Sequence, residues 1–288
     1  MDYLQIIDKL EEETSTMIEQ LAGTTASSSA EIEGFLADFI ATLQRNSDGT
    51  IKSSVDNLKA INKLRPQLND FITKTEYGQQ SIKFAGEYKD LTPLMNDYFA
   101  SMALEFTKPA LLKEVLNTSI QYTVDSLIGS GMDASFSEPI LNIFKSAVTS
   151  GSDRASIKNA IKEYLIENEK LGKYASQVSE DAVHQYTSHY IDTISADLGL
   201  EYYYFKGTKI ADSRPQCVKM VGYYFTAKQL KQVVDSGVQL NGGKGWQGMI
   251  PGTNWNNYKI YRNGYRCRHY ILPVSKVIYD KAVKKWPN

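Results

Sequence analysis

The chain has 288 residues, of which 42% are hydrophobic and 23% are charged, and its formal net charge is −1. These values are typical of globular proteins and exclude wholesale disorder, a collagen-like chain and a chain that is only a coiled coil. The length predicts about two domains, each large enough to bury a core. No apolar run approaches the ~20 residues that a bilayer-spanning helix needs, and the acidic start of the chain differs from a signal peptide. We therefore expect a soluble protein without a membrane span.

The near-zero net charge conceals a strong asymmetry along the chain. Residues 1–50 carry ten acidic and two basic side chains, whereas residues 201–288 carry 15 Lys or Arg and four acidic side chains, a net charge of +11. The same last 88 residues contain 15 of the 32 aromatic residues, all three tryptophans and both cysteines. A basic surface predicts an anionic partner, and the alternative is a surface whose charges balance those of the acidic N-terminal half.

Apolar residues at helical spacing predict seven or eight consecutive helices before residue 200. The second of these is expected to begin at Ser29, which would act as its N-cap after a polar run, and Pro66 is expected to interrupt the third. Pro109 and Asp153 fit the starts of two later helices. In chain order the expected helices cover residues 3–21, 29–43, 55–72, 91–106, 109–129, 139–148, 153–165 and 174–198.

The pattern changes near residue 200. Residues 200–205, with three consecutive tyrosines, predict a strand, and residues 226–235 predict a short helix capped by Thr226. A long loop rich in Gly and Asn is expected over 237–257, and two further strands over 256–261 and 270–274. The predicted fold class is mainly α: an acidic multi-helix body of residues 1–199 is followed by a small, basic, aromatic-rich α+β module of residues 200–288.

Two cysteines and a histidine in the module suggest a metal site. Cys267 and His269 can reach one ion from a single extended segment, and Cys217 can supply a third ligand. Zinc accepts this set of nitrogen and sulfur ligands, and a structural site needs four, so His184 or His189 is a candidate for the fourth. A Cys217–Cys267 disulfide is a second interpretation, and two buried cysteines that pack as small hydrophobic side chains are a third.

The two histidines of the helix 174–198 do not themselves indicate a metal site. Their five-residue spacing places them about 140° apart around the helix, and the four-residue spacing usual for two metal-binding histidines is absent. We expect His184 and His189 to be surface or interface residues.

An enzyme is not expected. Cys217, His269 and Asp212 supply the residue types of a nucleophile, a base and an orienting acid, but no nucleophile elbow or helix-terminal cysteine accompanies them. Residues 241–245 (Asn-Gly-Gly-Lys-Gly) lack the remainder of a phosphate-binding loop.

A dense group of aromatic and basic residues follows residue 245. Such a group suits stacking on unpaired bases and contact with phosphates, and equally suits a protein–protein interface or the core and rim of a small module. The candidate binding residues are Trp246, Trp255, Lys259, Arg262, Arg266 and Arg268.

The ordered motifs of this module resemble a known family. Residues 212–217 read Asp-Ser-Arg-Pro-Gln-Cys, residues 246–254 read Trp-Gln-Gly-Met-Ile-Pro-Gly-Thr-Asn, and residues 264–269 read Gly-Tyr-Arg-Cys-Arg-His. Together with Gly222, Phe225 and Pro273, they resemble the C-terminal domain of phage minor head proteins, the Mu F-like head morphogenesis family of tailed bacteriophages. The resemblance covers about residues 200–275.

In many members of that family an Arg is followed shortly by a His, and a His-Pro element precedes Cys-Arg-Cys. Here Cys217 stands at the place of the first His and His269 at that of the last Cys, an exchange that a metal site tolerates. The His-Pro element is missing, since Asn263-Gly264-Tyr265 stands there, which leaves the fourth ligand open.

The resemblance implies a non-enzymatic virion component, made in the host cytoplasm and held at the portal vertex or capsid interior. Its partners would be the portal and capsid proteins, contacted by the helical body, and non-specific DNA during packaging or delivery. Two other hypotheses stay open: a nucleic-acid-binding module not tied to a particle, and a Cys-dependent hydrolase or transferase delivered with the phage.

Overall fold

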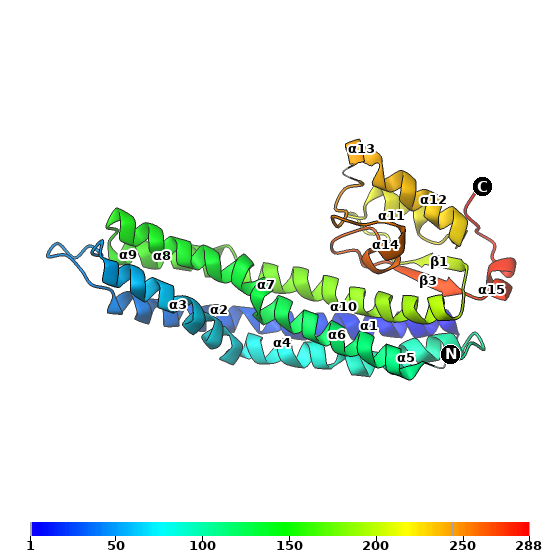
Figure 1. Ribbon diagram of the computed structural model, residues 1–288, viewed down its shortest axis with the longest axis horizontal. Helices are drawn as coiled ribbons and strands as arrows, with labels where there is room; N and C mark the ends of the chain where they lie inside the picture. The colour runs from blue at the N-terminus through cyan, green and yellow to red at the C-terminus, as the bar shows by residue number, and fades with distance from the viewer. Residues whose placement is uncertain (1, 107, 244, 288) are drawn as a thin grey trace. The chain divides into compact units, whose positions relative to one another are not determined.

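The structure is a computed structural model that describes residues 2–106, 108–243 and 245–287. The described residues are mainly helical and include one three-stranded antiparallel sheet near the C-terminus, which confirms the predicted fold class (Figure 1). Across these ranges, no helix combines the length and the apolar character needed to cross a bilayer.

The helices that precede the sheet follow the predicted order, except that residues 76–86 form a helix that was not predicted and the helix expected over 91–106 ends at Ala100. They are α1 (Tyr3–Gly23), α2 (Thr25–Thr42), α3 (Val55–Lys74), α4 (Glu76–Gly86), α5 (Tyr88–Ala100), α6 (Pro109–Ile128), α7 (Ser130–Met132), α8 (Glu138–Ser150), α9 (Arg154–Lys162) and α10 (Lys170–Asp197), with π-helical turns η1 (Asp133–Ser137) and η2 (Glu163–Glu167) before α8 and after α9.

The chain divides into two compact units. Unit 1 comprises residues 2–14, 88–119 and 180–287, and unit 2 comprises residues 15–87 and 120–179. This division differs from the expected single boundary at residue 200, because the terminal segment shares a unit with parts of α1, α5 and α10. Long-range contacts explain the grouping: the Tyr98 hydroxyl of α5 donates to the Pro273 carbonyl at 2.6 Å, and the hydroxyls of Tyr3 and Tyr224 lie 2.9 Å apart.

Two expectations about unit 2 were wrong. Helix α2 begins at Thr25 rather than after Ser29, because the polar run is satisfied inside the helix: the Ser29 hydroxyl donates to the Thr25 carbonyl at 2.7 Å, and the Ser28 hydroxyl accepts the Tyr77 amide at 2.9 Å. Helix α3 continues through Pro66. Its buried face, which includes Leu64 and Leu68 on either side of the proline, offsets the roughly 3 kcal/mol that an interior proline costs.

The sheet of unit 1 is built from three short strands. β1 (Tyr202–Lys206) lies between β2 (Tyr224–Thr226) and β3 (Tyr270–Val274), and both pairings are antiparallel. Tyr203 is opposite Phe225 on one side and Pro273 on the other. The predicted strands at 200–205 and 270–274 are thus confirmed, and β2 was not predicted.

The predicted strand at 256–261 is wrong, because this segment is helix α14 (Trp255–Tyr261). A capping box starts the helix: the Asn254 side chain accepts the Asn256 amide at 2.9 Å, and the Asn257 side chain accepts the Asn254 amide at 2.8 Å. The aromatic residues that suggested a strand lie on a helical turn whose Tyr258 is buried.

Short helices complete the module. They are α11 (Pro215–Met220), α12 (Ala227–Val238), α13 (Leu240–Gly243) and α15 (Lys276–Lys281). The expected loop over 237–257 therefore contains the end of α12, helix α13 and the start of α14, and its Lys244 lies outside the described residues.

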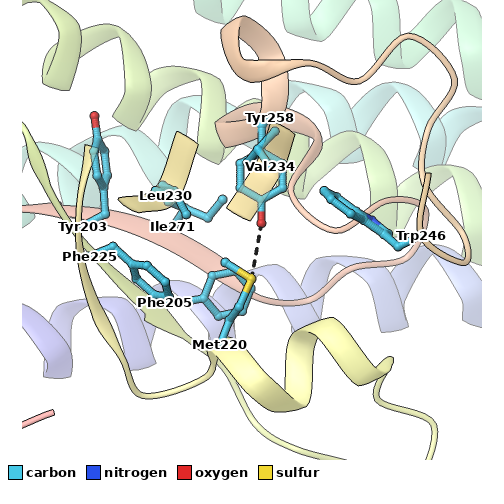
Figure 2. Close-up of a cluster of buried hydrophobic side chains, with 9 residues drawn as sticks. All are labelled: Tyr203, Phe205, Met220, Phe225, Leu230, Val234, Trp246, Tyr258 and Ile271. Atoms are coloured by element: carbon cyan, nitrogen blue, oxygen red, sulfur yellow. Dashed lines mark hydrogen bonds between the residues drawn. The ribbon is translucent and has the colours of Figure 1, made fainter. Parts of the chain in front are cut away.

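Helix α12 and the sheet enclose the hydrophobic core of the module. Figure 2 shows this core, in which the Tyr258 hydroxyl points toward the sulfur of Met220, 3.7 Å away, and Trp246 lies beside the Tyr258 ring. The core residues are Tyr203, Phe205, Met220, Phe225, Leu230, Val234, Trp246, Tyr258 and Ile271.

The N-cap of α12 gives a first testable prediction. The Thr226 hydroxyl accepts the Gln229 amide at 3.2 Å, as predicted from the sequence, and the Gln229 side chain accepts the Thr226 amide at 2.9 Å. Thr226→Ala removes the cap, so the free energy of unfolding should fall by about 1 kcal/mol, measured by urea denaturation. Thr226→Ser keeps the hydroxyl and should remain close to wild type; equal losses in both variants would contradict the capping role.

Candidate metal centre

The three residues singled out from the sequence meet in the interior of the module. Cys217 lies on α11, and Cys267 and His269 lie in the segment that leads into β3. Their exposed fractions are 2%, 2% and 7%. One ligand atom from each lies within 4.8 Å of the others, and the Cys267 sulfur is 3.7 Å from Nδ1 of His269. We call these three residues the Cys/His cluster.

Hydrogen bonds between distant segments bring the cluster together. The Arg214 guanidinium, just before α11, donates to the carbonyls of Asn263, at 3.1 Å, and Tyr265. The Tyr265 amide in turn donates to the Gly248 carbonyl at 2.9 Å. Gly264 permits this approach: its φ is +107°, and a Cβ there would lie 1.9 Å from the Gly248 oxygen. Three separate stretches of sequence are thereby fixed to one another.

Asn263 supports the cluster from one side and was not identified from the sequence. Its amide nitrogen donates to the Cys217 sulfur at 3.2 Å, and its amide oxygen accepts the Tyr258 hydroxyl at 2.8 Å. Its backbone carbonyl also accepts the indole nitrogen of Trp246 at 3.1 Å. Asn-Gly is a common turn dipeptide, so nothing local in the sequence distinguished this residue.

The two cysteines are free thiols, and their pKa values are shifted in opposite directions. The pKa of Cys217 is raised by its hydrogen bond to Cys267 and by burial. The pKa of Cys267 is lowered by the hydrogen bond from Cys217, against the effect of burial, and further by His269 and Arg262. Cys267 is therefore the member of the pair that more readily becomes the thiolate, the form that binds metals.

His269 is held in a fixed orientation. Its ring stacks on Phe205 with centroids 5.5 Å apart, and Gly207 lies against its other edge. Nδ1 faces Cys267, whereas Nε2 is buried and has no hydrogen-bond partner among the described residues. The side chain is thus oriented to offer Nδ1 to the cluster.

Arg262 is not the surface residue that the sequence suggested. It is fully buried, with a backbone φ of +54°, and within the described part of the chain its guanidinium nitrogens have no hydrogen-bond partner. Its positive charge lowers the pKa of Cys267 and opposes the rise in the pKa of Asp181 that burial causes. Trp246 is buried as well, so neither side chain presents itself to a surface partner.

The other predicted binding residues are paired with acidic side chains of α10. Arg266 and Arg268 both bind the buried carboxylate of Glu180, at 3.2 and 3.0 Å. Lys259 pairs with Asp192 and lies 5.8 Å from the ring centre of the half-buried Trp255. Much of the local positive charge is therefore matched within unit 1.

The charge of unit 1 as a whole supports the same view. Its residues 1–14, 88–119 and 180–199 carry 13 acidic and four basic side chains, a net charge of −9. Set against the +11 of residues 201–288, this leaves +2. The basic module is balanced largely by the helices with which it shares a unit.

The remaining candidates do not join the cluster. His184 is buried, with its ring against Tyr270, so the expectation of a surface position was wrong for this residue; burial and the nearby Arg262 lower its pKa. Within the described ranges, the metal-capable group contains neither His184 nor the half-buried His189. Asp212 is exposed and stands outside the cluster, so the Cys217–His269–Asp212 arrangement is not assembled.

The cluster offers two sulfur ligands and one imidazole to a metal ion. Two surface cavities lie elsewhere: one is lined by residues of α8 and α9 in unit 2, the other by residues of α5, α6 and α10 in unit 1. Comparisons with protein families, with curated proteins and with solved structures found no match.

Gly207 provides a test of the ring orientation. A Cβ at this position would lie 2.2 Å from Cδ2 of His269, so Gly207→Ala should displace the imidazole and weaken Co²⁺ binding about tenfold or more, measured by the thiolate-to-cobalt absorption band. Gly222→Ala is the matched control, because Gly222 also has a positive φ (+86°) but its Cβ would meet only the Lys284 amine at 3.7 Å. Equal cobalt affinities in the two variants would contradict this geometry.

Proposed function

We propose that this chain is a structural, non-enzymatic minor head protein of a tailed phage. It associates with the portal vertex and capsid interior and contributes to head assembly and to DNA packaging or delivery. One observation carries the proposal: the three segments on which the family resemblance rests, residues 212–217, 246–254 and 264–269, meet around the Cys/His cluster. The resemblance thus follows one packed unit rather than scattered short matches.

The contacts made by the residues that carry the family resemblance favour a structural function. Arg214 binds two carbonyls of the segment 263–265, and Gly248 accepts a hydrogen bond from that same segment. Cys217 and Cys267 are buried, so they are removed from any substrate in this conformation. Residues that bind one another in the interior fix a module's shape, which is the requirement of an assembly protein.

We further propose that the cluster binds zinc as a structural staple. Two thiols and an imidazole match the preference of Zn²⁺, and the depressed pKa of Cys267 favours the thiolate that the ion needs. The module rests on a three-stranded sheet and short helices, so a bound ion would add substantially to its folding free energy.

A free-standing nucleic-acid-binding module is less well supported. Arg266, Arg268 and Lys259 are engaged by acidic residues of α10. In the proposed head protein, non-specific contact with DNA would fall to exposed lysines of the module such as Lys209, Lys219 and Lys228.

The zinc proposal is tested by native mass spectrometry of the full chain before and after a strong chelator. One zinc per chain is expected in the wild type, and it should be lost in Cys217→Ser, Cys267→Ser and His269→Ala because each removes a ligand. His189→Ala is the control, since this histidine lies outside the cluster, and it should retain the metal. A wild-type chain that is metal-free after expression with zinc would overturn the staple.

The head-protein proposal is tested in purified particles of the encoding phage. Quantitative mass spectrometry should detect the chain at a few copies beside abundant capsid protein, and it should co-purify with the portal protein when the two are co-expressed. Cys217→Ser/Cys267→Ser should reduce this association if the module must be folded to assemble. Absence of the chain from both particles and proheads would sink the proposal.

A further inference from the structure

Residues 284–287 lie along the outer edge of the sheet, and we call them the strap. β2 is an outer strand, and the backbone of its Tyr224 binds the strap through both of its polar groups. The Tyr224 amide donates to the Lys284 carbonyl at 2.9 Å, and the Trp286 amide donates to the Tyr224 carbonyl at 2.7 Å. This is the bridge of a short added strand, parallel to β2. An extended peptide that adds to a sheet edge is held in the same way.

Trp286 anchors the strap through its side chain. Its half-buried ring stacks on Phe225 with centroids 4.8 Å apart and packs edge-to-face on Tyr223 at 5.2 Å. Its carbonyl accepts the side-chain amide of Gln229 at 3.1 Å, and the Lys284 amine lies 4.1 Å from the centre of the Tyr223 ring. The surface made by residues 223–225 and Gln229, which we call the strap groove, thus combines backbone pairing with an aromatic pocket.

The stretch that connects the strap to the sheet is weakly held. Every residue of helix α15 is at least partly exposed, and Val283 is fully exposed. The contacts of Lys285 with this helix lie at the surface: its amine donates to the Asp280 carbonyl at 3.2 Å and lies 4.9 Å from the centre of the Tyr279 ring. Contacts of exposed charged groups contribute little to stability. The strap is therefore held mainly by the strap groove and not by its connection to the chain.

These properties make the strap exchangeable between copies of the chain. The groove fits a tryptophan that is preceded two residues earlier by a lysine, and a second copy carries the same segment. A strap from that copy would remake the same backbone and ring contacts, which is the condition for exchange of an identical element. The structural cost is then limited to a rotation of the exposed link at Ala282 and Val283.

We propose that the strap groove is a docking site for the strap of a second copy of this chain, so that two copies join by exchanging residues 284–287. Such an exchange is reciprocal, because each groove receives one strap. The chain's own strap competes at an effective concentration of about 1 mM, so exchange is favoured where copies are crowded together. The proposal depends neither on the zinc site nor on the head-protein assignment.

The test mixes two full-length variants with complementary defects. Trp286→Ala keeps the groove but removes the anchor of its strap, whereas Tyr223→Ala keeps the strap but removes one wall of its groove. The strap of Tyr223→Ala should enter the groove of Trp286→Ala, which its own strap no longer fills. The two variants should therefore associate at least about tenfold more tightly than either does with itself, measured by analytical ultracentrifugation.

Val277→Ala is the matched control for Trp286→Ala. It changes an apolar residue of α15 that is 62% exposed and lies outside the strap. Its own strap still fills its groove, so its mixture with Tyr223→Ala should associate no more than the wild type does with itself. Equal association in the two mixtures would contradict exchange through the strap groove.

A labelled peptide of residues 281–287 separates the groove from its occupant. It should bind Trp286→Ala at least about tenfold more tightly than it binds the wild type, whose own strap competes. The same peptide carrying Trp286→Ala should not bind. Peptide binding without association of the two variants would overturn the second copy as the occupant. A peptide that does not bind Trp286→Ala, while the sheet amides of that variant stay protected from hydrogen exchange, would overturn the docking site.

The wild type gives a readout that no substitution disturbs. In a mixture of isotope-labelled and unlabelled chains at about 1 mM, nuclear Overhauser contacts are expected between Trp286 of one copy and Tyr223 of another. Their absence would overturn the exchange even where a variant fails to fold.

Discussion

The terminal module depends on one polar arrangement, in which the half-buried Arg214 and the buried Asn263 hold α11 against the segment leading into β3. The two bonds from Arg214 join residues 49 and 51 positions apart, and the Asn263 carbonyl accepts both the Arg214 guanidinium and the Trp246 indole. Because the hydrophobic core of the module is small, this polar network fixes the relative positions of Cys217, Cys267 and His269. The cluster is a consequence of the same bonds that define the module's shape.

Ion pairs between basic residues of the module and acidic residues of α10 hold the module against that helix within unit 1. The buried Glu180 forms ion pairs with both Arg266 and Arg268, and Asp192 forms an ion pair with Lys259. Buried carboxylates are stable only when cations compensate them, so the acidic face of α10 requires a basic partner. The charge asymmetry of the sequence therefore largely reflects ion pairs between the module and α10. Only part of the positive charge of the module remains to bind an external anion.

Much of the fold was predictable because its signals are local. The spacing of apolar residues gave most of the helices, and the Thr226 cap gave the start of α12. The errors occurred where tertiary packing overrode a local rule: helix α3 continues through Pro66, Ser28 and Ser29 are buried inside α2, and the residues from Trp255 to Tyr261 form a helix. In each case burial or side-chain hydrogen bonding outweighed the local preference.

By itself, the sequence determined the fold class, the split in charge and the three candidate ligands, since residue type and spacing along the chain define them. Only the tertiary structure decided that Trp246 and Arg262 are interior residues, that Asn263 supports Cys217, and that Glu11 pairs with Lys206 at the end of β1. These facts arise from contacts between segments far apart in the chain. Such contacts depend on how α1, α10 and the sheet pack, which a pattern of neighbouring residues does not encode.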